Sequence, residues 1–96
     1  MNAPKSLTIR LNAADNVVVS RAEMPPGTEI AEEGIASIEA IPTSHKIATQ
    51  PIATGAAVRK YNQIIGFATQ DIATGAHVHV HNVAVRDFER DYAYGA

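Results

Sequence analysis

Apolar and polar positions alternate only over short stretches of this chain, and no apolar run exceeds three residues. No window keeps the apolar stripe of an amphipathic helix beyond two turns, whereas short alternating stretches are typical of half-buried strands. Six glycines and five prolines divide the chain at short intervals, as turns between strands do. The pattern predicts a mainly β fold with single helical turns starting at Gln50 and Gln70, and strands at 6–11, 17–20, 28–30, 35–40, 45–48, 57–60, 64–68 and 77–81.

An internal repeat organises the middle of the chain. Residues 48–58 and 68–78 are identical at nine of eleven positions, and they differ only at Pro51/Asp71 and Ala57/His77. A fainter copy at 24–30 aligns with 52–58. The shared unit is an apolar residue, two turn-forming residues, a glycine, two variable residues and a second apolar residue. We expect the glycine to adopt a positive φ angle and to turn the chain into a new strand. Two clear copies are too few for a solenoid, so the repeat predicts pseudo-symmetry within one domain.

Composition supports a small β domain and excludes several functions. Seventeen alanines, ten isoleucines and eight valines supply most of the apolar side chains, and only two leucines are present. The absence of cysteine excludes disulfides and thiolate sites. A net charge of −2 argues against a nucleic-acid partner. No stretch is long and apolar enough for a membrane span or a signal peptide, so we expect a cytoplasmic protein.

The segment from His77 to Asn82 is the most informative for chemistry. On a strand, side chains alternate between faces, so Val78 and Val80 would enter the core while His77, His79 and His81 form a row on the other face. Imidazoles bind divalent metals, hydrogen-bond to carboxylates and transfer protons near neutral pH. An exposed strand with incidental histidines is the alternative, and three alternating histidines among four in the chain favour a function.

Two further groups of candidate residues lie nearby in the sequence. His45 and Lys46 follow Pro42 and precede an apolar stretch, and Lys60 and Tyr61 close the strand after the first clear repeat. A solvent-facing role is the alternative for each. Residues 40–84 hold three cations and all four histidines against Asp71 alone, whereas residues 11–39 hold six acids against one arginine. The second part therefore suits an anion, and the acids of the first part predict a solvated face.

Several reaction types have no support in the sequence. We find no glycine-rich phosphate loop, no zinc-binding His-Glu motif and no serine nucleophile in its usual setting. Few acids accompany the histidines as a general base. The chain is therefore expected to contribute part of a site rather than a complete one.

The ordered motifs resemble the amino-terminal SAF domain of altronate and galactarate dehydratases, which has a small β-clip fold. The resemblance is carried by Asp15-Asn16-Val17, Ser44-His45-Lys46-Ile47-Ala48, Lys60-Tyr61 with Ile64-Ile65-Gly66, His77-Val78-His79 with His81-Asn82, and 87–92. Family members usually carry glycine where this chain has Ser44. The resemblance implies a SAF-like domain at 1–85 and a connector at 86–96 toward a catalytic region absent from this chain.

What the resemblance implies about function is an accessory role in a hydro-lyase that removes water from a sugar acid. It implies a divalent metal, Fe²⁺ or Mn²⁺, with His79 and His81 as candidate ligands. It also implies a large catalytic domain or subunit as partner. A homo-oligomer is a further alternative. A stand-alone anion-binding module, the small subunit of a sulfolactate-type lyase and a structural interaction domain remain alternatives. The substrate-site or metal-site candidates are His45, Lys46, Lys60, Tyr61, His77, His79, His81 and Asn82.

Overall fold

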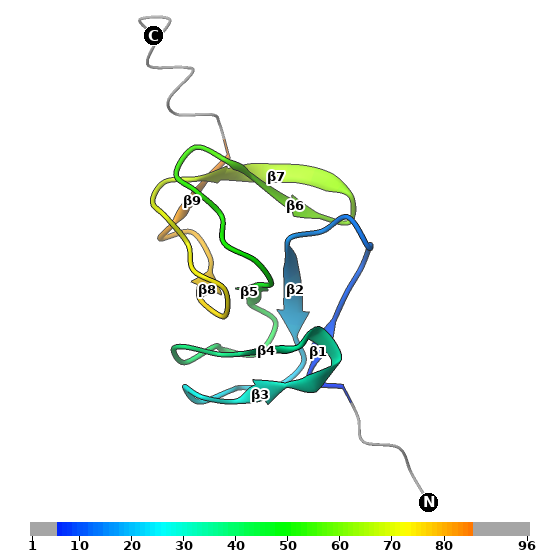
Figure 1. Cartoon of the computed structure of the whole chain (residues 1–96). Helices are drawn as coiled ribbons and strands as arrows, with labels where there is room; N and C mark the ends of the chain where they lie inside the picture. Colours follow the sequence, from blue (N-terminus) through cyan, green and yellow to red (C-terminus); the bar gives the residue numbers. More distant parts are fainter. Residues whose placement is uncertain (1–5, 86–96) are drawn as a thin grey trace, which may run out of the picture.

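The computed structural model describes residues 6–85, which form nine short strands and one 3-10 helix (Figure 1). The strands make a four-stranded antiparallel sheet in the order β1-β2-β5-β8, a two-stranded sheet β3-β4 and a three-stranded sheet β6-β7-β9. Their bounds are β1 (Thr8–Ile9), β2 (Val17–Ser20), β3 (Glu29–Ile30), β4 (Ile35–Ala36), β5 (Lys46–Ala48), β6 (Ala57–Lys60), β7 (Gln63–Ala68), β8 (His77–Val78) and β9 (Val83–Ala84). The mainly β fold is confirmed.

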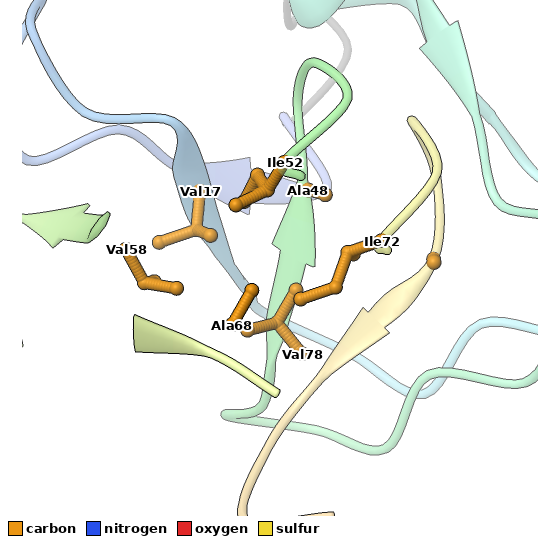
Figure 2. Close-up of a cluster of buried hydrophobic side chains, with 8 residues drawn as sticks. Val17, Ala48, Ile52, Val58, Ala68, Ile72 and Val78 are labelled. Carbon is orange, nitrogen blue, oxygen red and sulfur yellow. The ribbon is translucent and has the colours of Figure 1, made fainter. Parts of the chain in front are cut away.

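The four-stranded sheet separates two clusters of buried apolar side chains. Because side chains alternate along a strand, Val17 and Val18 of β2 point to opposite faces. Val18 packs with Met24, Ile30, Ile41 and Ile47. Figure 2 shows the other cluster, in which side chains from five strands (β2, β5, β6, β7 and β8) and from the two bridged loop positions Ile52 and Ile72 approach one another: Val17, Ala48, Ile52, Val58, Ala68, Ile72 and Val78. Burial of an isoleucine or valine side chain contributes about 1.5–3 kcal/mol, so these clusters hold β5 and β8 in place.

The repeated unit folds as a turn that leads into a strand. Gly27, Gly55 and Gly75 have φ angles of 84°, 84° and 86°. These values match the third position of a type II turn, which favours glycine because a side chain is strained there. Strands β3, β6 and β8 each begin two residues after one of these glycines. The predicted role of the glycine is confirmed.

A fourth copy of the unit spans residues 41–47, which the sequence pattern did not indicate. Ser44 takes the place of the glycine and adopts a φ of 70°, and β5 begins two residues later. The backbone N–H of His45 donates to the Pro42 carbonyl at 3.2 Å, as that of Ala56 does to the Ala53 carbonyl at 2.9 Å. The serine therefore preserves the turn that delivers His45 and Lys46.

The four copies meet in two pairs. Met24 and Ile41 exchange two backbone hydrogen bonds of 2.9 Å, and Ile52 and Ile72 exchange two of 2.8 Å. Each pair buries its apolar residues in a different cluster. The predicted pseudo-symmetry is present in the structure.

The details differ from the prediction in several places. The segments at Gln50 and Gln70 are bends rather than helical turns, and the 3-10 helix is η1 (Ala31–Glu33), between the strands predicted at 28–30 and 35–40. Strand β9 was not predicted, and β8 ends at Val78 instead of residue 81. The predicted connector at 86–96 lies outside the described residues. Within residues 6–85, no helix has the length and apolar character that crossing a membrane requires.

Candidate functional site

The histidine-rich segment begins as a strand and continues as a tight turn. After β8, the backbone N–H of Asn82 donates to the His79 carbonyl at 3.1 Å. The buried Asn82 side chain accepts from the His79 N–H at 3.0 Å and donates to the His77 carbonyl at 2.9 Å. Asn82 therefore shapes the turn that carries the histidines.

The turn alters the predicted arrangement of side chains. Val78 is fully buried, as expected, but Val80 is 81% exposed. The expectation that Val80 enters the core is wrong, because faces alternate only within the strand and β8 ends at Val78. The exposed His81 ring lies 5.0 Å from the His77 ring, tilted by 33°. His77 and His79 remain half-buried, with ring centroids 5.6 Å apart.

The fourth histidine joins this group through the pairing of β5 with β8. Ile47 lies opposite His77 and Lys46 opposite Val78, so one further step places His45 beside His79. Their rings stack with centroids 3.9 Å apart. The His45 carbonyl accepts from the Ser20 N–H at 2.8 Å, which anchors this segment to β2. Residues 32 positions apart in the sequence thus form one cluster.

Ring nitrogens converge within the cluster. Nδ1 of His45 and Nε2 of His77 are 2.7 Å apart and share a hydrogen bond. One ring nitrogen from each of His45, His77 and His79 lies within 4.8 Å of the others. Nδ1 of His79 is buried without a hydrogen-bond partner among the described residues. An unsatisfied buried polar atom costs about 1–3 kcal/mol, so this atom is suited to a ligand.

The surroundings keep two of these imidazoles neutral. Burial lowers the pKa of His77, and the neighbouring histidines lower it further, while Glu39 opposes them. Burial also lowers the pKa of His79, together with the charges of His45 and Lys46. Near neutral pH, His77 and His79 therefore offer lone pairs to a proton, a hydrogen-bond donor or a metal ion.

Lys46, whose charge acts on His79, and Lys60 have no anionic partner among the described residues. Burial lowers the pKa of Lys46, and the charge of Lys60 lowers it further. Within residues 6–85, the single salt bridge joins Arg10 and Glu33 at 2.8 Å, so neither lysine is paired with a described carboxylate. Unneutralised positive charge in a partly buried position suits an anion.

Tyr61 lies at the tip of the β6–β7 hairpin and is 68% exposed. Tyr61 and Asn62 adopt φ angles of 62° and 58°, and the buried Asp15 carboxylate accepts both of their backbone N–H groups at 2.8 and 2.7 Å. No described hydrogen bond or ring contact joins Tyr61 to the histidines.

Several acids of the first part were expected to form a solvated face, and the structure gives them specific partners. Glu39 accepts from the His77 backbone N–H at 2.9 Å. Glu32 accepts from Leu7 N–H, Thr8 N–H and the Thr8 hydroxyl at 2.9, 2.9 and 2.7 Å. The role of Glu39 beside the site had no sequence signal, since it depends on contact with a segment 38 positions away.

The fold and site define a small β domain with a histidine and lysine cluster at one edge of its central sheet. The altronate/galactarate dehydratase SAF domain matches residues 6–86 of the chain, and the chain belongs to this family. The resemblance stated from the sequence motifs is thereby confirmed.

A curated relative is altronate dehydratase of Escherichia coli strain K12. It is 42% identical over 62 residues, which cover 62% of this chain and 12% of the relative. The chain therefore spans a small fraction of the length of that enzyme.

Proposed function

We propose that this chain is the accessory domain of a sugar-acid dehydratase and that its histidine and lysine cluster binds the acid substrate. The observation that carries the proposal is the convergence of His45, His77 and His79 in a member of this family, with Lys46 near enough for its charge to lower the pKa of His79. The site combines neutral imidazoles with the charge of Lys46, and neither Lys46 nor Lys60 of β6 has a paired carboxylate within residues 6–85. A sugar acid offers the complementary groups, a carboxylate and neighbouring hydroxyls.

The reaction removes water from a 2,3-dihydroxy carboxylate. A base takes the proton from the carbon next to the carboxylate, and negative charge develops on the carboxylate oxygens. The hydroxyl on the following carbon accepts a proton and leaves as water, and the resulting enol becomes a 2-keto-3-deoxy acid. Positive groups beside the carboxylate favour this step because they interact more strongly with the developing charge than with the ground state.

The geometry suggests a role for each part of the cluster. Lys46, with Lys60 beside it, binds the carboxylate, since burial of a cation without an anion is costly and an incoming anion relieves that cost. The neutral imidazoles of His77 and His79 hydrogen-bond to the substrate hydroxyls. Asn82 is a positioning residue that acts through the backbone of the two histidines.

The remaining machinery belongs to a partner in this proposal. The chain covers 12% of the length of its E. coli relative, so a large catalytic domain or subunit supplies the base and closes the site. The dehydratase activity is then a property of the assembled protein, which acts in the cytoplasm.

The test is dehydration of altronate by the chain combined with the large dehydratase component of the same organism, measured as formation of the 2-keto-3-deoxy acid. We expect activity with both components and at least a tenfold increase in KM for Lys46→Met. Arg59→Met is the matched control, because Arg59 carries the same charge as Lys46 but lies on β6, and its side chain is exposed. Equal effects of the two substitutions would contradict the assigned site.

A stand-alone anion-binding module is a second candidate, supported by the fact that the unpaired lysines belong to this chain itself. That alternative predicts carboxylate binding by the chain alone and no activity with the large component. Sulfolactate in the same assay separates the sulfolactate-type lyase from a dehydratase, since the first releases sulfite and the second releases water.

A further inference from the structure

We propose that His45, His77 and His79 form a three-nitrogen site for a transition-metal ion within this chain. The proposal deepens the proposed function, on which it rests for its biological setting, because it adds an ion to the same site. Two independent observations support it: the ring nitrogens lie within 4.8 Å of one another, and Nδ1 of His79 is buried without a partner among the described residues.

The donor set indicates the class of ion. Imidazole nitrogens suit Fe²⁺, Co²⁺, Ni²⁺ and Zn²⁺, whereas Mg²⁺ and Ca²⁺ take oxygen ligands. Mn²⁺ is suited to oxygen ligands such as carboxylate and water, and the three residues offer no carboxylate. Of the two ions implied by the family resemblance, the residues therefore fit Fe²⁺ better than Mn²⁺. Three protein ligands leave positions open for water or substrate, and an ion there would supply Lewis-acid stabilisation of the developing negative charge.

Binding requires a local adjustment of the rings. Metal–nitrogen distances near 2.1 Å place two ligand nitrogens about 3.0–3.4 Å apart. The His45–His77 pair is slightly closer than this, at 2.7 Å, and the hydrogen bond between them would be replaced by bonds to the ion. The rings of His77 and His79 are nearly parallel, at 11°, so their nitrogens must turn toward a common point. Rotation about the last side-chain torsion of histidine is broad and inexpensive, so the backbone need not move.

The backbone that carries the ligands is held independently of the ion. Asn82 fixes the turn after His77, and the Ser20 N–H fixes His45. Glu39 accepts from the His77 N–H and places negative charge near the site. These hydrogen bonds fix the backbone positions from which the three imidazoles project. The positive charge of Lys46 acts in the opposite direction, because it lies close enough to His79 to repel a cation.

Because the histidines attract the ion and Lys46 repels it, substitutions of the two residue types should change metal affinity in opposite directions. Co²⁺ is titrated into the full 96-residue chain, and binding is followed by the visible absorption of the ion and by calorimetry. We expect one Co²⁺ per chain, a loss of about 100-fold or more in affinity for His79→Ala and for His45→Ala, and unchanged or tighter binding for Lys46→Met. His81→Ala is the matched control, because His81 is exposed and outside the group of three.

Two results would overturn the metal site. One is the absence of stoichiometric Co²⁺ binding by the folded chain, and the other is an equal loss for His81→Ala and His79→Ala. Circular dichroism of each variant identifies a loss that reflects unfolding, and the two separate alanine variants guard against one of them failing to fold. Co²⁺ binding without altronate dehydration would contradict the proposed function and leave the metal site supported. Altronate dehydration without Co²⁺ binding would contradict the metal site and leave the proposed function supported.

Discussion

The loops 48–58 and 68–78 have nearly the same sequence and the same turn, yet only the second carries a histidine that joins the candidate site. Gly55 and Gly75 have φ angles within 2° of each other, and the hydrogen bonds that close the two turns measure 2.9 and 3.0 Å. The single change within the turn and strand is Ala57 in one loop and His77 in the other. The shared residues form the same turn in both loops, while one variable position supplies the histidine of the candidate site.

The strands that follow the two loops also have different neighbours. Strand β6 pairs with β7, and Asp15 holds the hairpin tip beyond it. Strand β8 pairs with β5, which brings His77 beside His45, and Asn82 holds the turn beyond it. The comparison shows that the histidines converge where one copy of the repeat pairs with a second copy that also carries a histidine.

The largest expected effect concerns the shared glycine. A Cβ on Gly75 would lie 2.1 Å from the Ala36 carbonyl oxygen, whereas a Cβ on Gly27 meets nothing within 4 Å. Both residues have positive φ, so both alanine variants are strained, but only Gly75→Ala adds a backbone clash. We expect Gly75→Ala to lower the free energy of unfolding by about 3 kcal/mol or more and Gly27→Ala by about 1 kcal/mol. Urea denaturation measures both, and equal losses would show that the equivalent turns are not packed differently.

The next largest loss of stability is expected from substitutions of Asp15 and Asn82, the residues that hydrogen-bond to the turns beyond β6 and β8. Asp15→Ala removes two hydrogen bonds to a buried carboxylate and is expected to cost about 2–3 kcal/mol. Asn82→Ala removes two neutral bonds and is expected to cost about 1–2 kcal/mol. NMR signals of the histidine rings should shift in Asn82→Ala and stay in place in Asp15→Ala, since Asp15 contacts Tyr61 and Asn62 instead. Similar histidine shifts in both variants would mean that the two turns are coupled.

A smaller effect lies at Glu32, away from both loops. Burial alone would raise the pKa of Glu32, but hydrogen bonds from the Thr8 hydroxyl and from backbone N–H groups lower it below the usual 4.5. A lowered carboxyl pKa stabilises the fold above pH 4.5, and that contribution disappears as the pH falls through the folded-state pKa. We expect Glu32→Gln to cost about 1 kcal/mol at pH 7 and less at pH 3, measured by urea denaturation. A constant difference across this range would contradict the assigned hydrogen bonds.

Much of the fold followed from local chemistry in the sequence. Glycine at a fixed position between apolar residues predicted the turns at Gly27, Gly55 and Gly75, and β-branched runs predicted most strand positions. The copy at 41–47 was missed because Ser44 hides the pattern, although its backbone follows the glycine conformation. The end of β8 was missed because the Asn82 side chain, rather than the alternation of His and Val, determines where the strand stops.

The candidate site was predicted in its residue types more than in its arrangement. The histidine run indicated His77 and His79. His45 was predicted as a candidate because Lys46 follows it in the sequence. Their convergence depends on the β5–β8 register, which joins residues 32 positions apart and leaves no trace in local sequence. The contribution of Glu39 likewise depends on a contact with a segment 38 positions away.

The most direct test gives the second loop the residue that the first loop has at the position of His77. His77→Ala gives β8 the alanine found at residue 57, and it removes one hydrogen bond of a half-buried side chain. We predict that the free energy of unfolding changes by less than about 1 kcal/mol while Co²⁺ affinity falls about 100-fold, measured on the same preparation. Unchanged Co²⁺ affinity in the folded variant would contradict the claim that this histidine makes the repeated loop functional.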